Sequence, residues 1–180
     1  MSKIDDIKKD LRANMNGVAS AAMRSTPDYR VNFGVELPRL QALAGEYGKD
    51  HELAQALWKE SVRECRILAT MTQPAEQFDS EFADLWMESV HTIEIAQIAA
   101  LNLFQYMDCA ADKAFQWIAS DDEIRQVTGL SILCHLMRRT ELNPRSQSEL
   151  NDQIQALLAD NNTPMTVRRL AMRLEGEVGA

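Results

Sequence analysis

Apolar residues recur at every third or fourth position along most of the chain, which is the pattern of amphipathic helices. We expect a first helix near the N-terminus, because six apolar positions there fall on one helical face. Those positions are Ile4, Ile7, Leu11, Met15, Val18 and Ala22. The segment 25–34, which contains one proline, interrupts the pattern. A second helix is predicted from Glu36 to about Tyr47, with Gly48 as its C-cap.

Four amphipathic segments recur farther along the chain, and each ends at a large apolar anchor. The anchors are Trp58, Trp86, Trp117 and Leu158, which are 28, 31 and 41 residues apart. A second amphipathic stretch follows each anchor after a short polar break. These stretches are Arg63–Met71, Ile93–Phe104, Ile124–Met137 and Val167–Leu174. Helix pairs that recur at such a spacing are the signature of an α-solenoid.

The repeat pattern therefore predicts an all-α fold, and we expect a single domain covering residues 1–180. No alternating run of β-branched residues indicates a strand. The three tryptophan anchors could stack on nucleic-acid bases. However, they occupy the same place in each repeat, and a large aromatic side chain at a helical seam is normally buried. We therefore assign Trp58, Trp86 and Trp117 to the core.

The composition is that of an acidic globular protein. Hydrophobic residues make up 46% and charged residues 26% of the 180 residues, and the net charge is −8. An acidic chain is repelled by nucleic acid and by anionic membranes unless a local basic face overrides the net charge. The sequence therefore requires such a face if the protein binds DNA.

The charges are unevenly distributed. Between Glu76 and Glu123 there are eleven acids and one basic residue, Lys113, so this stretch opposes DNA binding. The last 43 residues contain six arginines and six acids. Arg138-Arg139 and Arg168-Arg169-Arg173 are the main candidates for a basic face. The alternative is that they are solvated helix faces or salt-bridge partners.

Cysteine and histidine spacing gives no metal or redox motif. Cys65, Cys109 and Cys134 are expected to be buried, reduced thiols in a cytoplasmic protein. The three histidines have no ligand spacing, and no apolar run has the length of a signal peptide or a membrane span. We therefore expect no metal, no cofactor and no membrane partner.

The stretch from Asn32 to Met71 resembles the DNA alkylation repair family of HEAT-like-repeat DNA glycosylases. Three motifs carry the resemblance: Gly34-Val35 before a helix containing proline, the Leu-Ala-x-x-Leu-Trp run that ends at Trp58, and the Glu-x-Arg-Ile-Leu-Ala run that begins at Glu64. The likeness continues through the Trp86 segment to Asn102-Leu103-Phe104. It implies a right-handed α-solenoid of HEAT-like helix pairs.

The resemblance also implies a chemistry. Active members of the family hold duplex DNA on a positively charged concave face and remove cationic alkylated purines. An aspartate stabilises the cationic sugar that forms as the base leaves, tryptophans contact the lesion, and arginines hold phosphates. A carboxylate stabilises the developing charge, whereas a neutral amide does so only weakly.

This sequence departs from the family pattern at the positions that carry the chemistry. Ile93 stands where the family has its first tryptophan, and Gln97 stands where it has the final aspartate. Val127 replaces an arginine, and the run from Val167 to Arg173 contains no tryptophan. Glu94 is the remaining acid that could serve as a substitute carboxylate. The matching positions therefore retain no catalytic residue.

Two functional hypotheses follow from these departures. The first is a catalytically silent family member that acts as a binding scaffold for a basic protein partner or, weakly, for duplex DNA. The second is an active glycosylase of cationic alkylated purines with weak or relocated chemistry. Candidate nucleic-acid-binding residues are Arg30, Arg39, Arg63, Arg66, Arg125, Arg138, Arg139, Arg168, Arg169 and Arg173. No motif supports an unrelated small-molecule enzyme.

Overall fold

The computed structural model describes residues 3–24, 31–139 and 142–178, and within these ranges it contains helices and no strand. The all-α fold predicted from the repeat pattern is therefore confirmed. The chain divides into two compact units, Met1–Phe78 and Asp79–Ala180. The expectation of one domain over residues 1–180 stays a prediction.

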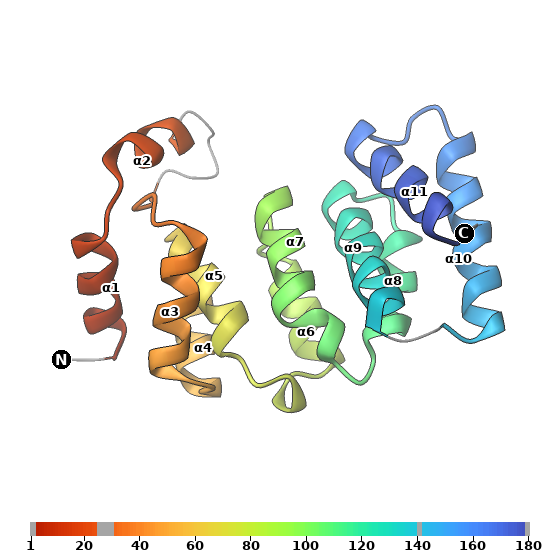
Figure 1. Ribbon diagram of the computed structural model, residues 1–180. Helices are drawn as coiled ribbons and strands as arrows, with labels where there is room; N and C mark the ends of the chain where they lie inside the picture. Colours follow the sequence, from red (N-terminus) through yellow and green to blue (C-terminus); the bar gives the residue numbers. More distant parts are fainter. Residues whose placement is uncertain (1–2, 25–30, 140–141, 179–180) are drawn as a thin grey trace. The chain divides into compact units, whose positions relative to one another are not determined.

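The first unit contains five α-helices and a short 3-10 helix among its described residues. They are α1 (Lys3–Ala13), α2 (Gly17–Met23), α3 (Leu37–Tyr47), α4 (His51–Trp58), α5 (Arg63–Thr72) and η2 (Ala75–Gln77). Helix α5 packs against both α4 and α3, and α1 contacts α4 (Figure 1). Helix α3 ends at Gly48, which has a φ of +68°, as the sequence predicted.

The prediction of one continuous first helix is wrong, because the chain breaks between α1 and α2. Asn16 caps α2: its side-chain oxygen accepts a hydrogen bond from the Ala19 amide at 3.1 Å. An asparagine followed by a glycine favours such a helix start over a helix interior. As a result Met15 and Val18, which were expected on the buried face, are 52% and 85% exposed.

The buried carboxylate of Glu64 organises the loop that precedes α3. Its two oxygens accept hydrogen bonds from the backbone amides of Phe33 and Val35, at 3.0 and 3.3 Å. Arg63 donates to the same carboxylate at 3.2 Å. Between the two bound amides lies Gly34, which has a φ of +66° and would place a Cβ 2.5 Å from the Asn16 carbonyl oxygen. The Gly-Val and Glu-x-Arg motifs of the sequence thus contact each other.

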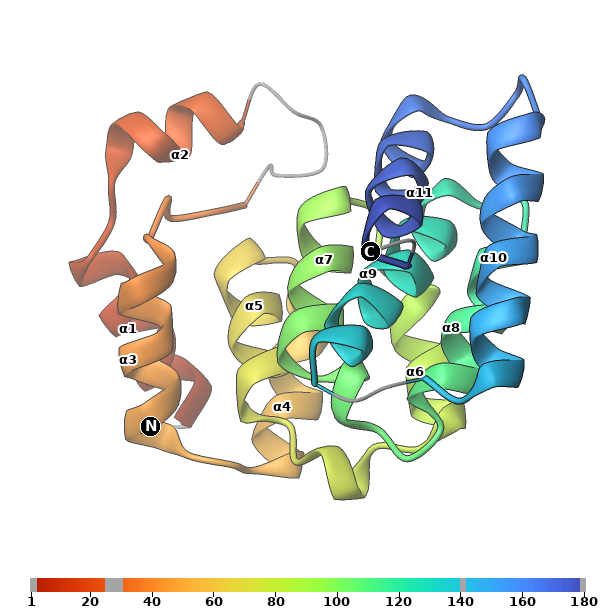
Figure 2. The same cartoon turned by 45° about the vertical axis from the view of Figure 1, so that its right-hand side comes forward.

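The second unit contains the remaining helix pairs. Its helices are α6 (Ser80–Met87), α7 (Ile93–Asn102), η3 (Phe104–Tyr106), α8 (Ala110–Ile118), α9 (Glu123–Arg139), α10 (Pro144–Ala159) and α11 (Met165–Val178). Helix α9 packs against α8, α7 and α11. Figures 1 and 2 show α7, α9 and α11 side by side, with α6, α8 and α10 forming a second layer. We call the first layer the α7–α9–α11 row.

The tryptophan anchors end helices and are buried, which confirms their assignment to the core. Trp58 ends α4, and Trp86 and Trp117 lie in the last turns of α6 and α8. The Trp117 ring lies 5.4 Å from that of Phe104, and its Nε1 donates to Asp84 Oδ1 at 3.3 Å. Burying a large ring with its polar edge satisfied is a stable arrangement.

Candidate nucleic-acid interface

The positions that the resemblance matches to the family's catalytic residues lie on α7 and α9, and they differ in exposure. Gln97 is exposed on α7, and Ile93 is half-buried at the start of the same helix. Val127 is fully buried in α9. Of these three side chains, Gln97 is therefore the one that exposes a polar group to solvent.

Glu94 lies in the first turn of α7 and is half-buried. The helix is capped by Thr92, whose hydroxyl accepts from the Ile95 amide at 3.3 Å. A carboxylate in a first helical turn is favoured by the helix dipole, which gives Glu94 a structural role. Residues three apart are also neighbours on a helix surface, so Glu94 and Gln97 lie on adjacent parts of α7.

The first unit uses its candidate arginines in internal contacts. Arg30 lies outside the described residues. Arg63 is buried against Glu64, and Arg39 pairs with Glu46 at 3.3 Å. These contacts neutralise both arginines within the unit.

Arg66 is held on the ring of Trp58. Its guanidinium carbon lies 5.6 Å from the ring centroid, and its Nε donates to the Glu60 carbonyl at 3.2 Å. Burial lowers the pKa of Arg66 below its ordinary value. The side chain thus packs against the anchor of its own helix pair, and its aliphatic stem adds to that packing.

In the second unit, Arg138 and Arg173 share one carboxylate. Arg138 donates to Glu177 at 3.1 Å and Arg173 does so at 3.4 Å. The hydrogen bond to Glu177 raises the pKa of Arg138. Burial acts to raise the pKa of Glu177, but the bonds and charges of the two arginines outweigh it and lower that pKa. The three side chains together keep one positive charge.

Two further arginines of this unit make directed contacts with other helices. The Arg139 guanidinium lies 4.4 Å from the centroid of the half-exposed Tyr106 ring and donates to the Gln105 carbonyl at 3.1 Å. Arg168 donates to the carbonyls of Leu158 and Asp160 at 3.0 and 2.7 Å. Arg168 thereby satisfies carbonyl groups at the C-terminus of α10, a structural use of the side chain.

Among the candidate DNA-binding arginines, Arg125 and Arg169 have guanidinium groups that are not used in internal contacts within the described residues. Arg169 is exposed on α11, and Arg125 is half-buried in the first turn of α9. Neither guanidinium forms an ion pair or hydrogen bond with the part of the chain that the structure describes. They are therefore the arginines best placed to contact a phosphate.

The helix pairs separate the charges of the second unit. The α7–α9–α11 row carries six arginines and four glutamates, a net charge of +2. The rest of Asp79–Ala180 carries two basic and twelve acidic residues, a net charge of −10. Like charges on one layer raise the local potential even when the whole unit is acidic.

The acidic stretch between Glu76 and Glu123 places most of its acids outside this row, and its effect on DNA binding stays a prediction. Only Glu94 and Glu123 of its eleven acids lie on the row, because the others fall on η2, α6, α8 and the connecting turns. Its one basic residue, Lys113, is buried in an ion pair with Asp84. A linear charge count could not separate the two layers.

Within the described residues, no cluster of three or more His, Cys, Asp or Glu side chains could hold a metal ion. Cys65, Cys109 and Cys134 form no disulfide, and Cys65 and Cys134 are buried as expected, whereas Cys109 is half-buried. Burial raises the pKa of the Cys65 thiol to about 12. None of the helices in the described ranges is both long and apolar enough to span a membrane.

Comparison with known proteins gives two matches. The profile of a family described as "DNA alkylation repair enzyme" matches residues 7–166. A solved structure is similar over 97% of this chain and 79% of its own, with a TM-score of 0.83 and 18% sequence identity. It is described as belonging to "a new family of proteins related to the HEAT-like repeat DNA glycosylases with affinity for branched DNA structures". The likeness confirms the HEAT-like fold. No curated protein matches the sequence.

Proposed function

Because the chain belongs to the DNA alkylation repair enzyme family, we propose that it is a DNA-binding scaffold that has lost the glycosylase reaction. Gln97 is the observation that carries this proposal. It is an exposed, uncharged side chain at the position where the resemblance expects the catalytic aspartate.

The chemistry of the reaction explains why this one substitution matters. As a cationic base leaves, positive charge develops on the sugar, and the protein lowers the barrier by placing a negative charge beside it. The amide of Gln97 has no charge to offer. The missing tryptophan at Ile93 and the buried Val127 support the same conclusion, since neither side chain stacks on a lesion or holds a phosphate.

DNA binding is supported by the charge of the α7–α9–α11 row. The row is positive within an acidic unit, and Arg125 and Arg169 make no ion pair among the described residues. The similar structure with affinity for branched DNA supports DNA as the ligand. Phosphate contacts of this kind give an affinity that falls steeply with salt.

The test of lost catalysis is the release of 7-methylguanine from methylated DNA. The protein is held in excess over the DNA at low salt, and binding is verified by electrophoretic mobility. We expect release no faster than the spontaneous rate, both for the wild type and for the Glu94→Ala variant.

Glu94→Ala is the decisive variant because Glu94 is the carboxylate of α7 next to Gln97. Glu88→Ala, an exposed carboxylate just after α6, is the matched control. Suppose that the wild type releases 7-methylguanine faster than the spontaneous rate, and that Glu94→Ala abolishes this release whereas Glu88→Ala does not. The protein would then be an active glycosylase with relocated chemistry.

A further inference from the structure

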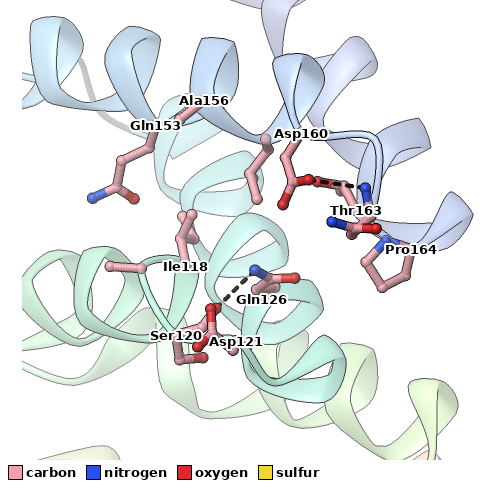
Figure 3. Close-up of a pocket in the computed structure, with 12 residues that line it drawn as sticks. Ile118, Ser120, Asp121, Gln126, Gln153, Ala156, Asp160, Thr163 and Pro164 are labelled. Carbon is pink, nitrogen blue, oxygen red and sulfur yellow. Dashed lines mark hydrogen bonds between the residues drawn. The ribbon is translucent and has the colours of Figure 1, made fainter.

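A cavity of about 440 Å³ lies between two turns of the second unit (Figure 3). The turn from α8 to α9 forms one wall, and the end of α10 with the turn into α11 forms the other. Figure 3 shows Gln153, Ala156 and Asp160 facing Ile118 and Gln126 across this space. The volume falls within the range of sites that bind an organic group and is far larger than a bare metal ion needs.

The cavity has an apolar base. Ile118, Ala156 and Leu157 line it, and Ile118 and Leu157 also belong to the buried core. Such a surface gains free energy by contact with a hydrocarbon chain and gives nothing to a small hydrated ion. The ligand is therefore expected to carry an aliphatic segment.

Two carboxylates lie at the polar side of the cavity. Asp121 makes no hydrogen bond or ion pair with any residue that the structure describes. Asp160 Oδ1 accepts from the Asn162 amide at 2.9 Å, which fixes the carboxylate beside the opening. The lining contains no lysine, arginine or histidine, and the Arg168 guanidinium outside it donates to the Asp160 backbone carbonyl.

The amide oxygen of Gln153 independently indicates a ligand with N–H donors. Gln126 is only 9% exposed, and its Nε2 donates to the Ser120 carbonyl at 2.7 Å (Figure 3). That bond holds the Gln126 amide at the edge of the cavity. Gln153 Oε1 is buried and has no hydrogen-bond partner among the described residues. A buried acceptor that lacks a donor costs about 1–3 kcal/mol, which a bound donor would recover.

We propose that this cavity binds the side chain of an arginine presented by a protein partner. A guanidinium offers five N–H donors in a plane, enough to reach two carboxylates and an amide oxygen, and its three-carbon stem suits the apolar base. Lysine has fewer donors in a less fixed geometry. The site lies at the turns between helices, so it requires no contact with DNA and stands independently of the proposed DNA-binding function.

The experiment is an NMR titration of the full chain with a short peptide, acetyl-Gly-Arg-Gly-amide. We expect amide shifts confined to residues 120–122 and 160–163. The same peptide with citrulline, which keeps the shape and removes the charge, should produce no such shifts. Agmatine alone tests whether a free guanidinium suffices.

The variant for this test is Asp121→Asn with Asp160→Asn. The side-chain amide oxygen introduced at position 160 can still accept from the Asn162 backbone amide, so the turn is retained. We expect the double variant to weaken peptide binding at least about threefold, as removal of exposed ion pairs does. Asp152→Asn, which removes one exposed negative charge on α10 outside the cavity lining, is the control and should leave binding unchanged.

Several results would overturn the proposal. They are an absence of shifts, equal shifts with the citrulline peptide, or equal losses in the Asp152→Asn control and the double variant. Binding of agmatine without binding of the peptide would assign the cavity to a small cationic metabolite instead of a protein partner.

Discussion

The Glu64 carboxylate accepts hydrogen bonds from the backbone amides of Val35 and Phe33, which lie 29 and 31 residues earlier in the sequence. It binds the two amides on either side of Gly34 and an adjacent guanidinium, so a charged group is buried with its oxygens satisfied. The residues that carry the family likeness in the first unit therefore act in folding, whatever side chain stands at position 97. This explains how a strong family likeness can coexist with Gln97.

Replacement of Glu64 by alanine should destabilise the protein by about 3–5 kcal/mol, because it leaves Arg63 buried without its counter-charge and two amides without an acceptor. Urea denaturation measures this change. Glu52→Ala, an exposed carboxylate on α4, should change stability by less than about 0.5 kcal/mol. Equal effects of the two substitutions would contradict the role assigned to Glu64.

His135 should make folding sensitive to pH. Burial, together with the charges of Arg138 and Arg173, lowers its pKa in the folded state. As the pH falls below about 6.5, the unfolded chain binds a proton at this imidazole before the folded chain does, so stability decreases. The decrease continues until the pH reaches the lowered, folded-state pKa.

His135→Leu should therefore reduce the loss of stability between pH 7.5 and pH 5.5, measured by urea denaturation at both values. The wild-type protein in the same buffers is the reference, and its loss of stability should exceed that of His135→Leu. An unaltered pH dependence in His135→Leu would show that this imidazole is not responsible.

At the scale of helices, apolar spacing predicted the four helix pairs because each buries one continuous stripe. The anchors at Trp58, Trp86 and Trp117 fall at helix ends as expected. The spacing failed at Asn16, where a single capping side chain decides the local structure and the apolar pattern continues regardless. Apolar periodicity predicts which face of a helix is buried. It does not predict that a side chain such as Asn16 accepts a hydrogen bond from a backbone amide and thereby begins a new helix.

The packing of α8 against α9 depends on Gly129. A Cβ at this position would lie 2.5 Å from the Ala114 carbonyl oxygen and 2.7 Å from Ile118 Cγ1. Gly129→Ala should therefore destabilise the protein by about 1–3 kcal/mol despite the better helix propensity of alanine.

Gly45→Ala provides the matched control in α3, because nothing lies within 4 Å of the added methyl group. It should stabilise the protein by about 0.5–1 kcal/mol. Thermal unfolding of both variants checks the pair, and a stabilised Gly129→Ala variant would mean that the two helices do not pack so closely.

At the scale of the second unit, the sequence identified the arginines and could not identify their partners. Arg138, Arg139 and Arg168 match the predicted basic clusters, yet each is engaged by a carboxylate, an aromatic ring or a carbonyl. Pairs such as Arg138–Glu177 join residues 39 positions apart, which a linear pattern does not connect. The cavity near Asp160 could not be predicted from the sequence either, because its lining residues come from two separate helix pairs.

The charge of this unit becomes interpretable only after the helices are assigned to layers. A net charge of −8 for the chain argues against DNA binding, whereas the α7–α9–α11 row alone has a net charge of +2. A local field of this sign can attract phosphates while the acidic remainder limits the affinity. We therefore expect weak, salt-sensitive DNA binding on this layer.

The most direct test compares two arginine substitutions of equal charge in a fluorescence-anisotropy titration with a labelled four-way DNA junction. Arg169→Glu alters the α7–α9–α11 row, and Arg145→Glu alters the exposed start of α10. We predict that Arg169→Glu weakens binding at least about fivefold and lowers the slope of log affinity against log salt by about 1. Arg145→Glu should change neither quantity appreciably. Equal losses in both variants, or a loss confined to Arg145→Glu, would contradict the assignment of DNA binding to this row.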